Sequence, residues 1–268
     1  MAADFSIFGI QINIMKTAII QSPLVWENVK ANAEYFRQKI NAIAEVVDLI
    51  VLPEMFGSGF TMHPSAVSET MEGEMIATIK TLAKARNAAI TGSLVISENG
   101  KFYNRLIFVF PSGDIKTYDK RHLFSLAGEE KTYTKGQDRL VVAYKGWKIC
   151  PLVCYDLRFP VFSRNDADYD LLIYVANWPK VRINAWDILL SARAVENLSY
   201  VIGVNRIGTD GNGHDYNGHS QVVDFLGDYL LESQTSEGIF IAELDKSQML
   251  ETRKKLGFLD DKDAFSLL

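Results

Sequence analysis

Three residues that could support acyl transfer, Glu54, Lys120 and Cys154, each follow directly on a strand-like run. Loops at the carboxyl ends of buried strands often carry catalytic side chains. Each residue also has a structural explanation, because a carboxylate can cap the next segment, a lysine can be solvated and a lone cysteine often packs as a small apolar side chain. The presence of all three, in this order, favours a catalytic site.

Amide hydrolysis is a reaction that these residue types could catalyse, because it needs a nucleophile, a proton carrier and a donor to the oxyanion. Cys154 supplies a sulfur, and a nearby cation such as Lys120 favours its thiolate over the thiol. Glu54 can accept the thiol proton, pass it to leaving ammonia and then activate water. Lys120 and the backbone N–H of Tyr155 would hold the oxyanion, and one such donor is typically worth about 3–4 kcal/mol.

Two further residues could compete for these roles. His122 could act as the base in place of Glu54, but the sequence shows no partner to orient it, so we expect it to be structural or to line the pocket. Cys150 lies inside a predicted strand, and we expect it to pack in the core. Its Cα atom would lie about 13 Å from that of Cys154 at ~3.3 Å per residue, beyond disulfide reach. The chain is therefore expected to be reduced and cytoplasmic.

Composition excludes several classes of protein. The chain has 268 residues, a net charge of −5 and 48% apolar residues, which are ordinary globular values. Mild acidity argues against nucleic acid as a partner. The four histidines and two cysteines show no zinc-type spacing, so we expect no metal and no cofactor. Charged residues interrupt every apolar run well before ~18 residues, so we expect no membrane partner.

The elements that would position these residues alternate between strands and helices. Helical spacing predicts helices at residues 27–42, 74–86, 186–198 and 246–253, the last with Asp245 as its N-cap. Residues 119–139 are predicted to be mostly loop. Strands are predicted at 16–21, 48–52, 88–96, 102–110, 115–118, 140–144, 148–153, 171–176, 200–205, 220–223, 229–231 and 239–243. Strand clusters flanked by helices indicate one α/β domain with layered sheets.

Three motifs resemble the catalytic motifs of the nitrilase superfamily of carbon–nitrogen hydrolases. They are Leu-Pro-Glu-Met-Phe at 52–56, Lys-Arg-His-Leu-Phe at 120–124 and Cys-Tyr-Asp-Leu-Arg-Phe-Pro at 154–160. The resemblance is strongest with the omega-amidase branch, through Asn-Trp-Pro at 177–179 and the segments 192–197 and 205–212. It implies a single domain over residues 15–268 with a four-layer α-β-β-α sandwich fold. Residues 1–14 would then be an N-terminal extension.

The resemblance also implies a second glutamate and a dimer. Family members carry a further Glu, shortly before a Gly, that orients the lysine and the substrate. Both Glu129 and Glu130 precede Gly136, and the spacing to Gly136 and Tyr133 favours Glu129. A buried lysine needs such a counter-charge to stay protonated. The family commonly pairs through the helix after the nucleophile and through its C-terminal segment, and the apolar residues in 186–198 and 258–268 agree with a homodimer.

Omega-amidases act on short dicarboxylic monoamides and their 2-oxo analogues, so the resemblance implies a small-molecule amide substrate. A pocket cation should then bind the distal carboxylate. Arg158 is typical of the branch, although it could equally pair with Asp156. Phe124, Tyr155 and Trp178 could form walls of the pocket or pack in the core. The arginines that could bind the carboxylate are Arg121, Arg158, Arg182 and Arg206.

Other functions remain as alternatives. A related hydrolase of N-carbamoyl compounds or nitriles is one, although carbamoyl hydrolases more often carry Trp at the position of Arg158. A non-catalytic binding protein on the same fold is another, but it would be free to lose Glu54, Lys120 or Cys154, and all three are present. A nucleotide-binding module is poorly supported, because residues 208–213 lack the Gly-Lys-Ser/Thr ending of a phosphate loop. We expect those glycines to form a turn before the strand at 220.

Overall fold

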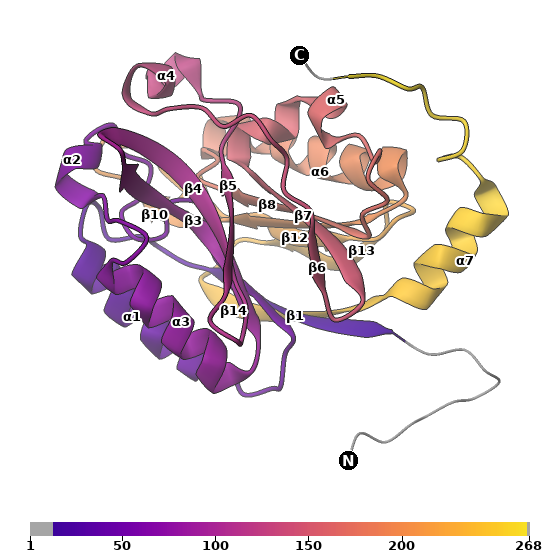
Figure 1. Cartoon of the computed structure of the whole chain (residues 1–268), viewed down its shortest axis with the longest axis horizontal. Coiled ribbons are helices and arrows are strands. Elements are labelled where there is room, and N and C mark those ends of the chain that lie inside the picture. Colours follow the sequence, from indigo (N-terminus) through magenta and orange to yellow (C-terminus); the bar gives the residue numbers. More distant parts are fainter. Residues whose placement is uncertain (1–12, 267–268) are drawn as a thin grey trace.

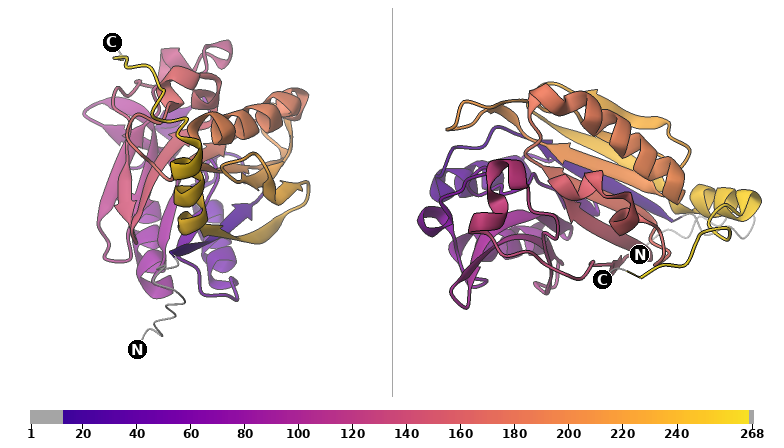
Figure 2. Two further views of the ribbon diagram at one scale, coloured as in Figure 1. Left: turned by 90° about the vertical axis from the view of Figure 1, so that its right-hand side faces the viewer. Right: turned by 90° about the horizontal axis from the view of Figure 1, so that it is seen from above.

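The computed structural model describes residues 13–266, and it has four layers. Two six-stranded sheets pack face to face, and helices cover their outer faces (Figure 1). Seen from above, the two sheets separate the early helices of the chain from the later ones (Figure 2). This arrangement confirms the predicted α-β-β-α sandwich. None of the helices in residues 13–266 has the length and the apolar character needed to cross a membrane.

The first sheet carries strands from the first half of the chain and one strand from near its end. Its order is β14 (Gly238–Asp245), β1 (Ile14–Gln21), β2 (Leu49–Val51), β3 (Ala89–Glu98), β4 (Lys101–Val109) and β5 (Ile115–Asp119). Strands β1, β2 and β3 are parallel, so β2 reads as a continuous apolar run buried on both faces. The apolar faces of α1 (Val29–Asn41) and α3 (Glu74–Arg86) pack on this sheet. The four-residue helix α2 (Pro64–Val67) lies between them in the chain.

The second sheet is built from the second half of the chain. Its order is β13 (Tyr229–Gln234), β12 (Ser220–Val223), β9 (Tyr200–Asn205), β8 (Leu171–Ala176), β7 (Trp147–Val153) and β6 (Val142–Tyr144). Strands β7, β8 and β9 are parallel, so their carboxyl ends lie at one edge of the sheet. Helix α6 (Ile183–Asn197) covers the outer face, and α5 (Pro160–Ser163) follows the end of β7.

One core cluster of apolar side chains joins the two sheets and α6, and a second lies where α1 and α3 pack on the first sheet. Helix α7 (Lys246–Leu256) extends from β14 along the edge of the molecule (Figure 1). Asp245 caps α7 as predicted, because its carboxylate accepts from the backbone N–H groups of Ser247 and Gln248. Cys150 is fully buried in β7, and both cysteines are free thiols, in agreement with the sequence analysis.

The structure differs from the sequence predictions in a few places. Short helical turns, η1 (Ser125–Ala127) and α4 (Glu129–Thr132), interrupt the segment predicted to be loop. Where a single turn was predicted before residue 220, the chain forms a hairpin of β10 (Ile207–Thr209) and β11 (Asp215–Asn217). Asp210 stabilises its turn by accepting from two backbone N–H groups and from the hydroxyl of Tyr216. Asx-type turns of this kind close a hairpin without a regular two-residue signal.

Candidate active site

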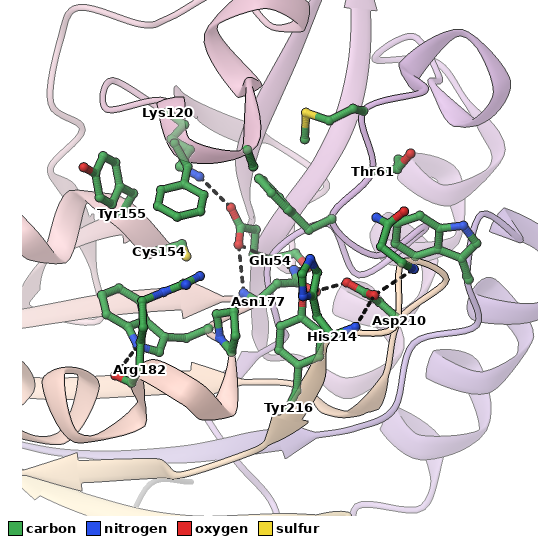
Figure 3. Close-up of a pocket in the computed structure, with 18 of the residues that line it drawn as sticks. Glu54, Thr61, Lys120, Cys154, Tyr155, Asn177, Arg182, Asp210, His214 and Tyr216 are labelled. Carbon is green, nitrogen blue, oxygen red and sulfur yellow. Dashed lines mark hydrogen bonds and ion pairs between the residues drawn. The ribbon is translucent and has the colours of Figure 1, made fainter.

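A pocket of about 350 Å³ opens at the edge where strands of both sheets end. Glu54, Lys120 and Cys154 all line it, although they come from segments far apart in the chain. Figure 3 shows the Cys154 sulfur facing Glu54 and Lys120, while Thr61 and Asp210 lie on the far side of the pocket. The fold therefore brings together the three residues that the sequence analysis placed at strand ends.

Glu54 follows β2 and is fully buried. Its Oε1 accepts from Lys120 Nζ at 2.9 Å and from Asn104 Nδ2 at 2.8 Å. Its Oε2 accepts from the backbone N–H of Asn177 at 2.8 Å, and the Asn177 side chain donates to the Glu54 backbone carbonyl at 2.7 Å. Charge-assisted bonds of this kind hold a carboxylate in one orientation. The carboxyl group of Glu54 is thus fixed from both sheets.

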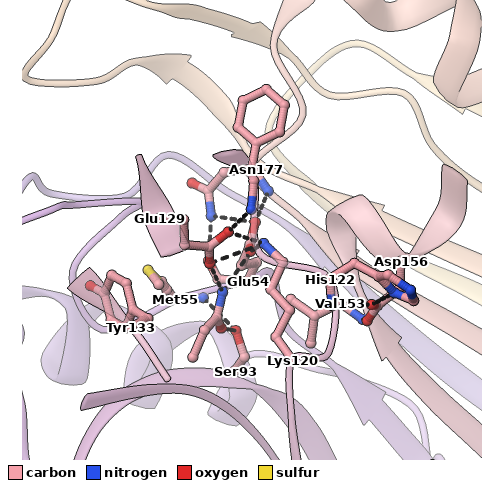
Figure 4. A network of polar contacts seen from close by, with 12 residues as sticks. Glu54, Met55, Ser93, Lys120, His122, Glu129, Tyr133, Val153, Asp156 and Asn177 are labelled. Carbon is pink, nitrogen blue, oxygen red and sulfur yellow. Dashed lines mark hydrogen bonds and ion pairs between the residues drawn. The ribbon is translucent and has the colours of Figure 1, made fainter. Parts of the chain in front are cut away.

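Lys120 follows β5, and its side chain has no exposed surface. Its Nζ donates to both oxygens of Glu129, at 3.1 Å and 2.9 Å, in addition to Glu54 (Figure 4). Burial alone would lower the pKa of Lys120, but the charges of Glu129 and Glu54 outweigh it and hold that pKa well above its usual value. The lysine is therefore a cation at neutral pH.

Glu129, the first residue of α4, is fully buried, whereas Glu130 is exposed. Its Oε2 accepts from the backbone N–H of Phe124 at 2.6 Å. Burial raises the pKa of Glu129, and Lys120 opposes that shift. The nearby Gly136 donates its N–H to the Lys120 carbonyl at 3.0 Å, and a Cβ there would lie 2.0 Å from the Asp119 carbonyl oxygen. The structure places Glu129, and not Glu130, against Lys120.

Cys154 begins the tight turn η2 (Cys154–Arg158) directly after β7. Its φ of 46° lies in the left-handed region, which is strained for a residue with a side chain and is concentrated at functional sites. Burial and the adjacent Glu54 raise the pKa of the thiol well above its usual value, although Lys120 acts in the opposite direction. Lys120 does favour the thiolate, as expected from the sequence, but a lysine shared by two carboxylates does not overcome the effects of burial and of Glu54. The thiol is neutral at rest.

Asn104 and Asn177 are polar residues of the site that the sequence analysis did not assign. The side-chain amide of Asn104, in the middle of β4, donates to Glu54 and also to Glu129 Oε1 at 3.1 Å. Its side-chain oxygen, Oδ1, accepts from the Ser93 hydroxyl. Asn177 follows β8 and ties the second sheet to Glu54. A polar residue inside the apolar strand 102–110 was the available signal for Asn104. For Asn177 the signal was its position directly after a buried strand.

Two of the four candidate arginines line the pocket. The Arg158 guanidinium lies 4.9 Å from the Trp178 ring centroid, and that of Arg182 lies 5.2 Å from the Phe124 ring centroid. Neither pairs with a carboxylate of residues 13–266. Tyr155 lines the same wall, with its ring 5.0 Å from that of Phe124. The predicted wall residues therefore do surround an open, cationic part of the pocket.

The other two arginines have different surroundings. Arg121 donates to the Gln137 carbonyl, and Arg206 is fully buried and donates to backbone carbonyls. Neither lines the pocket. The alternative that Arg158 pairs with Asp156 is wrong, because Asp156 instead accepts from groups of the Lys120 segment and of its own turn.

His122 has a partner that the sequence did not reveal. Its Nδ1 lies 2.7 Å from Asp156 Oδ1, and its ring stacks on Phe159 with centroids 3.7 Å apart. It does not line the pocket, so it is structural rather than pocket-lining. Within residues 13–266, His, Cys, Asp and Glu form no group of three or more that could hold a metal ion.

An α-β-β-α sandwich with a thiol beside a buried Glu–Lys–Glu cluster defines a class, the hydrolases of carbon–nitrogen bonds. The chain belongs to the carbon–nitrogen hydrolase family, whose model matches residues 16–254. It is 43% identical to the omega-amidase YafV of Escherichia coli K12, covering 94% of this chain and 98% of the relative. It is 32% identical to the 2-oxoglutaramate amidase of Bacillus subtilis, covering 88% and 91%.

A solved structure shows the same fold. The protein XC1258 of Xanthomonas campestris, described as a member of the CN-hydrolase superfamily with an arsenic adduct in its active site, superimposes with a TM-score of 0.92. The two sequences are 40% identical, and the match covers 95% of this chain and 99% of that one.

Proposed function

We propose that this protein hydrolyses the omega-amide of short dicarboxylic monoamides, of the 2-oxoglutaramate and succinamate type, to ammonia and the dicarboxylate. The observation that carries the proposal is the juxtaposition, in one pocket, of Cys154 and its Glu54–Lys120 pair with two arginines that have no acidic partner within residues 13–266. The names of the Escherichia coli and Bacillus subtilis relatives support the same activity.

In the acylation step, Glu54 takes the thiol proton as the Cys154 sulfur attacks the amide carbon. The carbonyl oxygen becomes an oxyanion, which Lys120 Nζ and the backbone N–H of Tyr155 hold. The tetrahedral intermediate then breaks its C–N bond. Glu54 returns the proton to the departing nitrogen, so ammonia leaves and a thioester remains on the sulfur. A neutral resting thiol requires this coupled transfer, because the thiolate is not available beforehand.

In the deacylation step, Glu54 accepts a proton from a water molecule that attacks the thioester carbon. The same donors hold the second oxyanion, and the C–S bond then breaks. The sulfur regains a proton from Glu54, and the dicarboxylate leaves. Glu129 takes part by keeping Lys120 protonated and in place, which its two bonds to Nζ support. One carboxylate and one lysine thus serve both halves of the reaction.

The distal carboxylate of the substrate would bind Arg158 and Arg182, between the aromatic rings of Phe124 and Trp178. Both guanidinium groups lie over a ring, and neither is paired with a carboxylate in the described part of the chain, residues 13–266, so both can donate to an incoming anion. A cation held in this way recognises a carboxylate by paired, charge-assisted bonds. This preference would select an acidic amide over a neutral one of equal length.

A panel of amides tests this function. Ammonia release is measured with 2-oxoglutaramate, succinamate, glutamine, asparagine, an N-carbamoyl amine and a nitrile. We expect the two acidic monoamides without an α-amino group to give the highest kcat/KM. Faster turnover of the carbamoyl amine or of the nitrile would overturn the omega-amidase assignment and leave the family membership intact.

The quaternary structure that we propose is a homodimer of single-domain subunits. Helix α6 exposes Ile188 at 58% and Val195 at 48%, and the neighbouring hairpin exposes Leu226 at 53%. Near the C-terminus, Phe258 is 57% exposed. Apolar surface of this extent is typical of an interface. Light scattering at micromolar protein should give twice the mass of 30.1 kDa, and a monomer would contradict the proposal.

A further inference from the structure

Lys120 and Cys154 act on the same carbonyl group in the proposed reaction, Lys120 on its oxygen and Cys154 on its carbon, yet they come from different sheets. Lys120 follows β5 of the first sheet, and Cys154 follows β7 of the second. A displacement of about 1 Å between such groups can cost about 100-fold in rate. The distance between the two segments therefore has to be held by contacts across the boundary between the sheets.

Asp156 makes such contacts on both sides of Lys120. It lies two residues after Cys154, and it accepts from residues two before and two after the lysine. Its Oδ2 accepts from the Tyr118 hydroxyl at 2.8 Å. Its Oδ1 accepts from the backbone N–H of His122 at 3.1 Å and lies 2.7 Å from His122 Nδ1.

The same carboxylate also fixes its own turn. Its Oδ2 accepts from the backbone N–H of Val153, the residue directly before Cys154, at 2.9 Å. Asp156 is fully buried, and no lysine or arginine of residues 13–266 pairs with it. A buried charge is tolerated only when hydrogen bonds satisfy it, and here four donors do so. Figure 4 shows Asp156 with His122 and Val153 beside Lys120 and separate from the Glu54–Glu129 network.

The donors themselves are held in place. Burial and the charge of Asp156 raise the pKa of Tyr118 well above its usual value, so its phenol stays protonated and continues to donate. The Tyr118 oxygen in turn accepts from the backbone N–H of Arg121 at 3.0 Å. The His122 ring lies flat on Phe159, which follows the nucleophile turn. Both segments are therefore fixed against the same carboxylate.

We propose that Asp156, with His122 and Tyr118, is a positioning assembly that sets the distance between Lys120 and the Cys154 sulfur. Asp156 touches no substrate in this arrangement and acts through the two residues that it aligns. His122 serves as a hydrogen-bond donor to Asp156, so its ability to gain or lose a proton is not used. The inference rests on the proposed roles of Lys120 and Cys154, but not on which amide is the substrate.

The first test is Asp156→Asn, which keeps the size of the side chain but replaces one acceptor oxygen by a donor. We expect kcat for the best amide of the panel to fall about 100-fold, with KM changed by no more than about twofold. Thermal unfolding followed by circular dichroism establishes how much folded protein is present. A folded Asp156→Asn protein with normal kcat would overturn the proposal.

His122 distinguishes positioning from proton transfer. His122→Asn places an amide N–H close to the position of Nδ1, so it should retain most of the activity, whereas His122→Ala should lose about tenfold or more. If His122→Asn were as inactive as His122→Ala, His122 would be acting as an acid or base and the proposal would be wrong.

Tyr118 offers a matched control for the loss of a buried hydroxyl. Tyr118→Phe removes one donor to Asp156, and Tyr174→Phe removes a comparable buried bond of 2.8 Å to Ser163 Oγ. Both changes should lower the unfolding temperature, Tyr118→Phe somewhat more because the backbone N–H of Arg121 also loses this acceptor, but only Tyr118→Phe should lower kcat. Equal effects on kcat would show that the hydrogen bond from Tyr118 to Asp156 contributes only to stability.

A second readout needs no amide at all. In a Cys150→Ala background, the reaction of Cys154 with methyl methanethiosulfonate reports its thiolate, which Lys120 favours. Displacement of Lys120 in Asp156→Asn should move the pH dependence of this reaction upward, and His122→Asn should leave it unchanged. An unshifted profile in Asp156→Asn would overturn the inference even if the amide panel had failed to identify a substrate.

Discussion

The two sheets bring polar groups that differ in burial to the same pocket. The first sheet supplies Glu54, Lys120 and Glu129, which are fully buried and bonded to one another. The second sheet and its loops supply Cys154, Arg158 and Arg182, which are only partly buried or exposed. The two arginines have aromatic neighbours but no acidic partners within residues 13–266.

This difference separates the groups that perform chemistry from those that select a substrate. Groups that must move protons and hold an oxyanion benefit from being fixed before the substrate arrives, because no reorganisation is then needed during the reaction. Groups that recognise a ligand need donors that the ligand can fill. Disturbing the first set should therefore lower kcat for every amide, whereas disturbing the second should change which amide is preferred.

The largest effect is expected at Cys154 and Glu54, where the second sheet meets the first. Cys154→Ala removes the nucleophile and Glu54→Gln removes the proton carrier, so each should lower kcat by about 10⁴-fold or more. Neither should form a thioester, which mass spectrometry of the protein mixed with substrate would detect. Activity of a few per cent in either variant, confirmed on protein free of wild type, would contradict the assigned role.

Within the buried cluster, Lys120→Ala should lower kcat by about 10²- to 10³-fold, the usual value of an oxyanion donor. It also leaves Glu54 and Glu129 as two buried carboxylates without their cation, so the unfolding temperature should fall as well. Lys120→Met separates these effects, because it restores most of the volume but not the charge. Steady-state kinetics with both variants is the measurement, and equal losses for acidic and neutral amides are expected.

Changing the two pocket arginines should alter the preference among amides rather than lower kcat for all of them. Wild type should prefer an acidic monoamide over a neutral amide of equal length by at least about 100-fold in kcat/KM. Arg158→Met and Arg182→Met should each reduce that ratio, mainly by raising KM for the acidic amide, because the carboxylate loses a charged partner. A ratio near one in wild type would refute the acid-binding pocket while leaving the amidase assignment standing.

The smallest effect is expected at the second cysteine. Cys150→Ala should keep most of the activity, because the residue is buried inside β7 and away from the pocket. Burial raises the pKa of Cys150 to about 12, so this thiol should not react at neutral pH in the folded protein. The raised pKa of Cys154 means that its thiolate forms only above the ordinary range, so its alkylation rate should still be rising at pH 9. A plateau below pH 8 would show a resting thiolate instead.

The sequence predicted the architecture and most of the site because both depend on local patterns. Apolar runs located the strands, and the residues at their carboxyl ends were those that line the pocket. The contacts that join the sheets could not be predicted in this way. Asn177 and Glu54 are 123 residues apart, and Asp156 and Tyr118 are 38 apart, so no local pattern links them. The net direction of the Cys154 pKa shift could not be predicted for a related reason, since the burial of the thiol depends on both sheets.

The backbone at residue 154 has a wider consequence. A φ of 46° is a conformation that glycine adopts without strain and cysteine does not. Selection for resistance to unfolding and selection for turnover therefore favour different amino acids at this one position. A library of variants screened only for thermal resistance should accumulate glycine there and lose its nucleophile in doing so. The protein maintains its sulfur in the turn at a standing cost in stability, and continued selection on activity is what keeps it there.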